Sequence, residues 1–288
     1  MPEIEVLERR PHPLSEFFDD LRQTRREKRA APGTRQRGAV LTIVRDEPVF
    51  FPIWLRYYSR HFDPQDIHVL DHGSTDASIE VGGFVRIPIE HDTVDNLWMV
   101  GTVESHQRRL LEEYDVVLTV DCDEIVAPDP ALGTLAEYVA GFGEGFVNCL
   151  GYEVFHLADR EPPFDPSRPV LEQRGYWSAA DGYDKPALAT EPISWTVGFH
   201  GRTDDRLNLD PDLYLIHLHR MDYEICRRRH ARWRDWAWNE EDLEESWGTH
   251  NRIADDEEFE RWFYTGTCFQ GENPVAIERI PARWRGVF

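Results

Sequence analysis

Short apolar runs alternate with amphipathic stretches in the first half of the chain. Residues 39–44 are almost entirely apolar and rich in β-branched side chains, a pattern typical of a strand buried on both faces of a parallel sheet. Phe50, Trp54 and Tyr57 instead share one helical stripe. The same two patterns predict strands at 67–70, 84–89 and 116–120 and a long helix between residues 97 and 114. This strand–helix–strand–strand–helix–strand order predicts a doubly wound α/β sheet.

The chain divides into three parts by its patterning. Residues 1–37 are charged and Arg-rich, and contain one stretch at helical spacing that predicts a short helix (Leu14, Phe17, Phe18, Leu21). Residues 38–221 are predicted to form the α/β domain, and its second half, 131–221, is predicted to carry further strands at 146–157, 193–200 and 213–219. Residues 222–288 are predicted to form a helical C-terminal extension, with one helix starting at Asp222 and another over 255–264.

Polar motifs follow two of the predicted strands directly. The strand at 67–70 leads into Asp71-His72-Gly73-Ser74-Thr75-Asp76, and the strand at 116–120 leads into Asp121-Cys122-Asp123-Glu124. Ligands of doubly wound sheets bind at the carboxyl ends of the strands, where both motifs are expected to lie. The position favours a role in binding over a purely structural turn.

Asp121 and Asp123 form an i, i+2 acidic pair after a buried strand. Carboxylate oxygens at a strand end suit Mg²⁺ or Mn²⁺, and a divalent ion there allows binding of a diphosphate and stabilises it as a leaving group. A bare Asp-x-Asp is also compatible with a solvated acidic turn that ends the strand. The surrounding motifs therefore decide between the two interpretations.

The charge balance restricts the ligands. The 288 residues include 54 acidic and 32 basic side chains, for a formal net charge of −22, and only Lys28 and Lys185 are lysines. An acidic field of this size repels phosphate backbones and anionic membranes, so nucleic-acid partners are disfavoured. A small anionic ligand requires a cation or a local arginine cluster to overcome the field.

The remaining composition indicates a soluble protein. With 41% hydrophobic residues, the chain has enough core material for one large domain or two small ones. We expect no transmembrane anchor, because the apolar runs are far too short, and no secretory signal is visible at the N-terminus. Four widely spaced cysteines predict thiols rather than disulfides, which favours a cytoplasmic location (Cys122, Cys149, Cys226, Cys268).

Taken together, three boxes resemble the family 2-like glycosyltransferases of the GT-A fold. They are Arg45-Asp46-Glu47, with Asp46 where that family more often has Asn, then residues 71–76, and then Asp121-Cys122-Asp123. The resemblance covers residues 38 to about 130. It implies a Rossmann-like, mostly parallel sheet flanked by helices, with a nucleotide-binding half at 38–130 and an acceptor half at 131–221. It also implies a metal-dependent transfer, by inversion, of a sugar from a nucleotide-sugar donor, such as a UDP-sugar.

The resemblance assigns roles to individual residues. Arg45, Glu47 and Asp71 are expected at the donor, with the two acids at the base and ribose. Asp121 is expected at the ribose or sugar and as a further metal ligand, and Asp123 is expected to bind Mn²⁺ or Mg²⁺. Glu124 is either a direct contact or a supporting carboxylate.

Later residues extend the same resemblance. His217 matches a strand histidine that often completes the metal site, and His219 should point to the same face. Lys185 and His200 match a Lys-Pro and Gly-x-His stretch and are candidates for donor phosphate or acceptor contacts. At most one or two of the three arginines at 227–229 are expected to reach a single site, because consecutive residues spread around a helix.

The catalytic base and the acceptor are not specified by any motif. Asp181, Asp204 and Asp205 are the loop carboxylates in the appropriate region, and we do not choose among them. The acceptor is left open among small molecules, glycans and peptides. Two alternatives remain. Residues 118–126 also resemble the nucleophile loop of haloacid-dehalogenase-like phosphatases, so the protein could be such a phosphatase. The second alternative is a catalytically inactive GT-A protein that binds sugar nucleotides.

Overall fold

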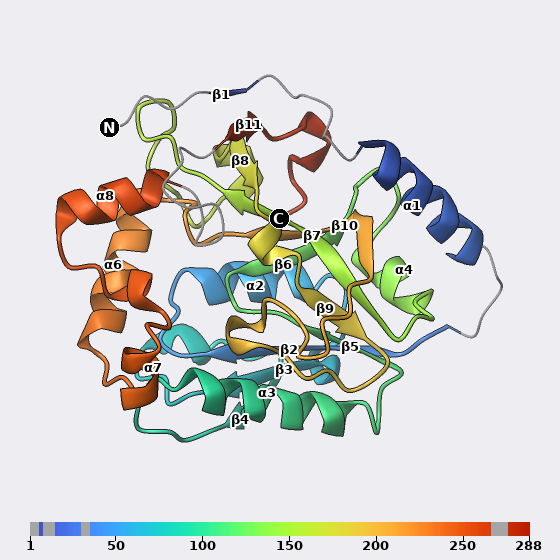
Figure 1. The fold of residues 1–288 in the computed structure, drawn as a ribbon, viewed down its shortest axis with the longest axis horizontal. Coiled ribbons are helices and arrows are strands. Elements are labelled where there is room, and N and C mark those ends of the chain that lie inside the picture. Colours follow the sequence, from blue (N-terminus) through green and yellow to red (C-terminus); the bar gives the residue numbers. More distant parts are fainter. Residues whose placement is uncertain (1–5, 8–14, 30–34, 266–275) are drawn as a thin grey trace.

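A computed structural model describes residues 6–7, 15–29, 35–265 and 276–288 (Figure 1). Its centre is one twisted sheet, whose strands along the main path follow the order β1-β11-β8-β7-β9-β5-β2-β3-β4, with β10 and β6 branching from β7. The first half of the chain supplies the parallel end of this sheet. The mixed end comes mainly from the second half, together with β1 and β6.

The parallel end contains four strands, β2 (Gly38–Val44), β3 (Ile67–Asp71), β4 (Val85–Pro88) and β5 (Val116–Thr119). β2 pairs in parallel with β3, bringing Val44 opposite Asp71, and with β5, bringing Leu41 opposite Thr119. Because all four strands run in one direction, their carboxyl ends share one edge of the sheet. The predicted α/β fold class, with a parallel central sheet flanked by helices, is confirmed.

Both faces of β2 are buried, as its uninterrupted apolar sequence predicts. Val40 and Val44 belong to one core cluster with helix α2 (Phe50–Tyr58), whereas Ala39 and Leu41 belong to a second cluster with helix α3 (Asn96–Leu110). Successive strand residues point to opposite faces, so α2 and α3 cover opposite faces of the sheet.

The mixed end is built from seven shorter or bent strands: β1 (Val6–Leu7), β6 (Glu124–Pro128), β7 (Phe146–Val154), β8 (Tyr176–Ala179), β9 (Pro186–Ala189), β10 (Leu209–His217) and β11 (Ile277–Arg279). β9 joins the two ends, because it pairs antiparallel with both β5 and β7. β10 lies between β6 and β7, antiparallel to the first and parallel to the second. Two short helices, α4 (Leu135–Ala140) and α5 (Val170–Gln173), lie between these strands in sequence.

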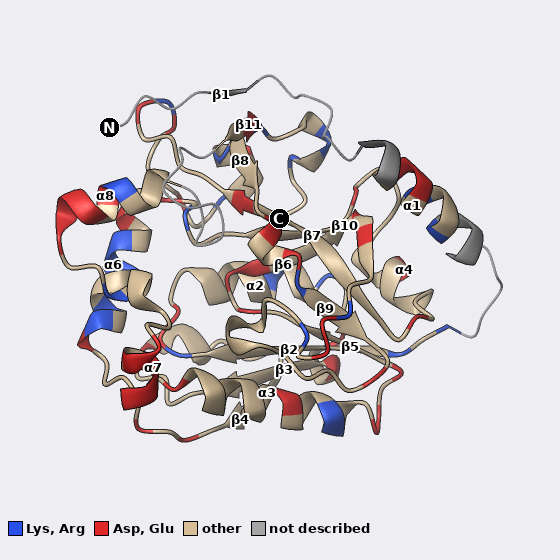
Figure 2. Cartoon of the chain, in the orientation of Figure 1, with Lys and Arg blue, Asp and Glu red and all other residues tan. Residues whose placement is uncertain are grey.

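The outer helices lie at opposite sides of the molecule. α6 (Tyr223–Asp235), α7 (Glu240–Glu244) and α8 (Asp256–Tyr264) form one side, and α1 (Ser15–Arg29) lies at the other, against β10 (Figure 1). Basic residues mark α6, and acidic residues mark α7 and the start of α8 (Figure 2). The arginines of α6 thus concentrate positive charge on that side of an acidic protein.

Most predicted elements are present, but the predicted helical segment 222–288 also contains β11, which joins the sheet, and one predicted strand is absent. The helices predicted near residue 14, from Asp222 and at 255–264 correspond to α1, α6 and α8. The strand predicted at 193–200 is wrong: the segment is irregular and contains a short 3₁₀ turn (Val197–Phe199), in which Gly198 adopts a φ of 78°. The other 3₁₀ segments are Pro64–Asp66, Ala77–Ile79, Asp181–Tyr183, Thr249–Arg252 and Ala282–Trp284.

The three described cysteines are free thiols, as the sequence predicts. Cys122, Cys149 and Cys226 are buried and free of disulfide bonds, and Cys268 lies outside the described residues. Within the described part of the chain, no helix combines the length and apolarity needed to cross a bilayer.

Candidate functional site

The Asp-x-Asp motif forms the turn between β5 and β6. β5 ends at Thr119 and β6 begins at Glu124, so residues 120–123 lie at the carboxyl edge of the parallel strands. β6 then leaves β5 and pairs with β10 instead. The motif therefore lies where the parallel and mixed ends of the sheet meet.

Strand register brings His217 to this motif. In β10, His217 pairs with Glu124 of β6 on one side and with Glu153 of β7 on the other. The backbone N–H of Leu218 also donates to the carbonyl of Asp123 at 2.8 Å. Paired residues of neighbouring strands project to the same face, so two carboxylates flank the imidazole. The predicted proximity of His217 to the motif is thus found in the structure.

Asp123 is buried among three positively charged or imidazole groups. Its Oδ2 accepts a short hydrogen bond from Arg229 Nη1 and lies 3.3 Å from His217 Nε2 and 4.0 Å from His219 Nδ1. Burial alone would raise the pKa of Asp123, but the Arg229 guanidinium and His217 hold it well below its usual range. Asp123 is therefore a carboxylate anion inside the protein.

Glu153 sets the orientation of His217. Its Oε2 lies 2.9 Å from His217 Nδ1, which leaves Nε2 directed at Asp123. Burial would lower the pKa of His217, yet Glu153 and Asp123 raise it to about 10. A histidine that binds a metal through one nitrogen commonly has a carboxylate behind the other, and Glu153 holds that position at Nδ1 of His217.

Asp121 faces a different cation from Asp123. Its Oδ2 lies 2.9 Å from Lys185 Nζ, which also contacts Glu124 Oε1 at 2.6 Å. Burial would lower the pKa of Lys185, but these two acids raise it, and the ammonium stays charged. Asp121 is one-third exposed, so solvent reaches the motif on its side. Lys185, expected at the donor phosphate or the acceptor, thus contacts Asp121 of the motif in this structure, and Glu124 lies behind it.

Arg229 reaches the motif from α6, and its guanidinium is fixed by an ion pair and by two aromatic rings. Its Nε lies 2.7 Å from Glu47 Oε1, and its guanidinium carbon lies 4.5 Å from the Phe50 ring centroid and 4.3 Å from that of Trp233. Burial raises the pKa of Glu47 to about 7 despite this partner. Glu47, expected at the donor base and ribose, is thus an internal partner of Arg229 in this structure. Arg227 instead pairs with exposed Asp256, so one of the three arginines reaches the site.

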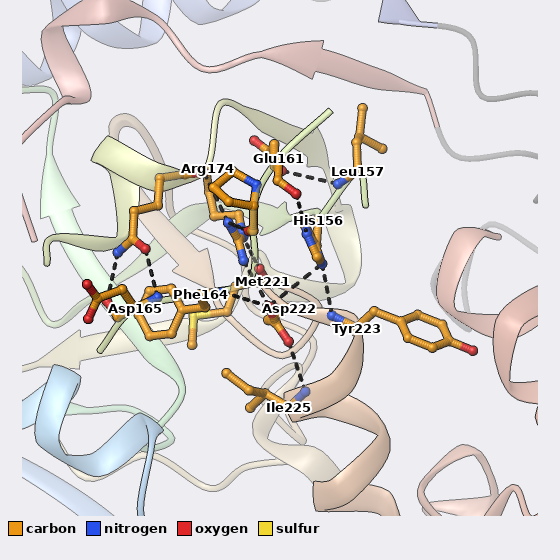
Figure 3. Close-up of polar contacts among 12 residues, drawn as sticks. His156, Leu157, Glu161, Phe164, Asp165, Arg174, Met221, Asp222, Tyr223 and Ile225 are labelled. Carbon is orange, nitrogen blue, oxygen red and sulfur yellow. Dashed lines mark hydrogen bonds and ion pairs between the residues drawn. The ribbon is translucent and has the colours of Figure 1, made fainter. Parts of the chain in front are cut away.

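A buried polar cluster fixes the corner between β10 and α6 (Figure 3). Asp222 caps α6 by accepting from Ile225 N at 3.0 Å, and its other oxygen lies 2.9 Å from Nη2 of the buried Arg174. Arg174 also donates to the carbonyls of Met221 and Pro162. This cluster holds the short segment that carries His217 and His219 on one side and Arg229 on the other.

The motif at 71–76 is ordered by two carboxylates, its own Asp71 and Asp46 of the preceding motif. Asp71 accepts from Ser74 N at 2.9 Å and pairs with Arg86 at 2.7 Å, and although burial opposes it, these contacts lower the pKa of Asp71. Asp46 has a φ of 51°, and its Oδ1 accepts from Thr75 N at 2.6 Å. Asp and Asn tolerate this left-handed conformation, which explains why Asp can stand where the family more often has Asn.

Arg45 is a charged group without hydrogen-bond partners at two of its atoms. Its Nε and Nη1 are buried and make no hydrogen bond within the described part of the chain, and its guanidinium carbon lies 4.6 Å from the Trp236 ring centroid. The buried hydroxyls of Thr42 and Thr119 are also unpaired there, and both line a cavity of about 10 Å³ beside Asp121 and Lys185. That volume holds about one water molecule.

The residues present fit a divalent cation. Asp123, His217 and His219 each offer a ligand atom, and these atoms all lie within 4.8 Å of one another. A mixed set of carboxylate and imidazole suits Mn²⁺ better than Mg²⁺, which prefers oxygen ligands alone. Asp121 is not part of this group, because its carboxylate turns to Lys185.

The base candidates remain separate from this group. Asp204 forms a pair with Arg202 at 2.7 Å, Asp205 is exposed with a φ of 55°, and Asp181 is exposed at the start of a 3₁₀ turn. His200 lies closer, because its ring packs on Tyr183, whose ring centroid is 4.2 Å from that of His217. Burial lowers the pKa of His200 to about 4.

Sequence reasoning missed Glu153 and the specific role of Arg229. Glu153 had a usable signal, since it is an isolated carboxylate in the apolar run of β7. Arg229 had a signal as well, because it is three residues after Cys226 and four before Trp233 and so shares the inward stripe of the helix.

No protein-family model and no curated protein sequence matches the chain. Among solved structures, a mannosyltransferase from Pyrobaculum calidifontis, in complex with GDP-Man and Mn²⁺, aligns at 14% identity and a TM-score of 0.36, over 71% of this chain and 66% of that one. Glucosyl-3-phosphoglycerate synthase from Mycobacterium tuberculosis, in complex with Mn²⁺, UDP and glucosyl-3-phosphoglycerate, aligns at 17% identity and a TM-score of 0.26, over 59% and 57%. The aligned part is less than two thirds of each of these solved chains. At this distance, function has to be argued from the site itself.

Proposed function

We propose that this protein is a metal-dependent glycosyltransferase of the GT-A type that transfers a sugar from a nucleotide-sugar donor, such as a UDP-sugar. The observation that carries the proposal is the approach of Asp123 Oδ2 and His217 Nε2, 3.3 Å apart, at the carboxyl edge of the parallel strands. Motifs 45–47 and 71–76 lie at the same edge, at the ends of β2 and β3.

Asp123 and His217 would hold the cation, and Glu153 orients the imidazole for it. When bound, a divalent cation neutralises the donor diphosphate and stabilises it as a leaving group. The protein adds two fixed cations at the same edge, Lys185 beside Asp121 and Arg45 with its unpaired nitrogens. Together these groups would bind a diphosphate in a protein whose overall charge opposes it.

The remaining roles follow from position. Asp71 is fixed at the end of β3 by Arg86 and Ser74 and would contact the nucleoside. Asp121, partly exposed and paired with Lys185, would lie between the diphosphate and the sugar. The transfer is proposed to invert the anomeric centre, with the base among Asp181, Asp204 and Asp205.

A thermal-shift screen of nucleotide sugars, with and without Mn²⁺, tests this proposal. A donor that binds only the folded chain raises the melting temperature. We expect one nucleotide-sugar class to stabilise the protein in the presence of Mn²⁺ and to do so much less in its absence. Failure of every nucleotide sugar to stabilise the chain, with Mn²⁺ present, would contradict the proposal.

A further inference from the structure

A second group of metal-ligand side chains lies directly behind the proposed donor site. It consists of His219, Cys226 and His230, whose ligand atoms all lie within 4.8 Å of one another. Cys226 and His230 are four residues apart on α6 and therefore share one face of the helix. His219 faces them from the segment between β10 and α6. Three ligand-type atoms thus meet from two elements of the chain.

The geometry within the group brings the ligand atoms together. His219 Nε2 lies 2.7 Å from His230 Nε2, and the two ring centroids are 5.0 Å apart. All three side chains are buried, and the rings of Trp233 and Trp262 pack against the imidazoles. The positive charge of Arg229, next to His230 in sequence, is already paired with Glu47 and Asp123.

The chemistry of this set differs from that of the donor site. Two imidazoles and one thiol form a nitrogen–sulfur set, which selects Zn²⁺ over the oxygen-preferring Mg²⁺ and Mn²⁺. We propose that His219, Cys226 and His230 bind a zinc ion that is separate from the cation of the donor diphosphate. Zinc binding forms one metal–sulfur and two metal–nitrogen bonds, and the Cys226 thiol releases its proton to solvent.

The orientation of His219 supports the assignment. With Nε2 directed at His230, its other nitrogen, Nδ1, lies 4.0 Å from Asp123 Oδ2. A ligating histidine commonly has a carboxylate behind its second nitrogen. His219 is thereby placed between the two sites, and a zinc ion would tie α6 to the end of β10. The ion would have three protein ligands from this group, which leaves one coordination position open, and it would hold Arg229 and His217 in place.

Metal analysis of the purified full-length chain tests the zinc site without any donor. We expect stoichiometric zinc, a lower melting temperature after removal by a chelator, and recovery on adding Zn²⁺. Substitution by Co²⁺ should give the near-ultraviolet band of a cobalt–thiolate bond. Cys226→Ser should abolish that band, whereas Cys149→Ser, which changes another fully buried cysteine outside the group, should keep it.

Two results would overturn the proposal: a chain that takes up no zinc after chelation and reloading, or a cobalt–thiolate band that survives in Cys226→Ser. If Cys226→Ser does not fold, His230→Gln serves instead and should weaken Zn²⁺ binding at least tenfold. The measurement is independent of the glycosyltransferase proposal, since it detects zinc in the absence of nucleotide. A Cys226→Ser protein that loses zinc but keeps Mn²⁺-dependent donor binding would show that the zinc site and the donor site are separate.

Discussion

Arg229 donates from Nη1 to Oδ2 of Asp123, the carboxylate oxygen that also faces His217. The guanidinium therefore lies on the atom that a divalent cation would bind. Lys185 stands in the same relation to Asp121, so each carboxylate of the Asp-x-Asp motif carries its own internal cation. An incoming metal ion has to compete with Arg229 for Asp123.

Arg229→Met should therefore tighten Mn²⁺ binding. The variant frees Asp123 but leaves two buried carboxylates, Asp123 and Glu47, without their partner, a loss that costs about 3–5 kcal/mol of stability in comparable buried pairs. We expect a lower melting temperature without metal, a larger rise on adding Mn²⁺, and roughly tenfold tighter Mn²⁺ binding by calorimetry, which corresponds to about 1.4 kcal/mol.

Arg227→Met is the matched control, because Arg227 lies on the same helix as Arg229 and its ion pair, with Asp256 of α8, is exposed. It should leave Mn²⁺ affinity unchanged. Weaker Mn²⁺ binding in Arg229→Met would show that Arg229 supports the metal site rather than competing with the metal.

Asp222→Ala should destabilise the fold severely. The side chain caps α6 and pairs with Arg174, which is completely buried. Removing it leaves a buried guanidinium uncompensated, for which we expect a loss of about 3–5 kcal/mol in urea unfolding. Asp255→Ala provides the comparison, since Asp255 caps α8 without a buried arginine and should cost about 1 kcal/mol. Equal losses in the two variants would refute the role assigned to the Arg174 pair.

The parallel half of the fold was predictable, because each strand there is a short apolar run followed by a polar turn. The mixed half was less so. β8 and β9 are four residues each and show no alternation of apolar and polar side chains. The segment 193–200 resembled a strand because Ile193 and Trp195 are core residues that pack with α3, but its backbone is irregular. Long-range pairing, rather than local pattern, decides which of these segments become strands.

The site was predictable as far as its motifs reach. Asp121, Asp123, Lys185 and His217 gather at one edge because they follow or neighbour strand ends. Glu153 and Arg229 were not identified, since their contacts depend on the register of β7 with β10 and on the rotation of α6. The strand register is not encoded in a local spacing, and the stripe of α6 indicates which arginine turns inward but not which residues it contacts.

Stability should depend on pH through Asp184. Burial, together with the neighbouring Asp181, raises the pKa of this carboxyl to about 7, even though Gly151 N donates to it at 2.7 Å. Between about pH 4 and pH 7, the folded chain thus binds a proton that the unfolded chain has lost, so stability falls as pH rises through this window. Asp184→Asn keeps an acceptor for Gly151 and should remove that part of the decline. An unchanged pH profile of the melting temperature in Asp184→Asn would contradict the assignment.

The phosphatase alternative makes a different prediction about substrates. A haloacid-dehalogenase-like enzyme hydrolyses p-nitrophenyl phosphate, whereas a glycosyltransferase acts on nucleotide sugars. We expect no p-nitrophenyl phosphate turnover and slow, Mn²⁺-dependent hydrolysis of the donor without acceptor. The opposite pair of results would favour the phosphatase, and absence of both with intact donor binding would favour an inactive sugar-nucleotide-binding protein.

The central claim is that Asp123 recruits a divalent cation for the donor diphosphate. Calorimetry of UDP binding, with and without Mn²⁺, tests it in the wild-type chain and in Asp123→Asn, with Asp256→Asn as a control for an exposed aspartate. We predict that Mn²⁺ tightens UDP binding at least about tenfold in the wild type and the control, and has no effect in Asp123→Asn. Equal enhancement by Mn²⁺ in a folded Asp123→Asn protein would contradict the account.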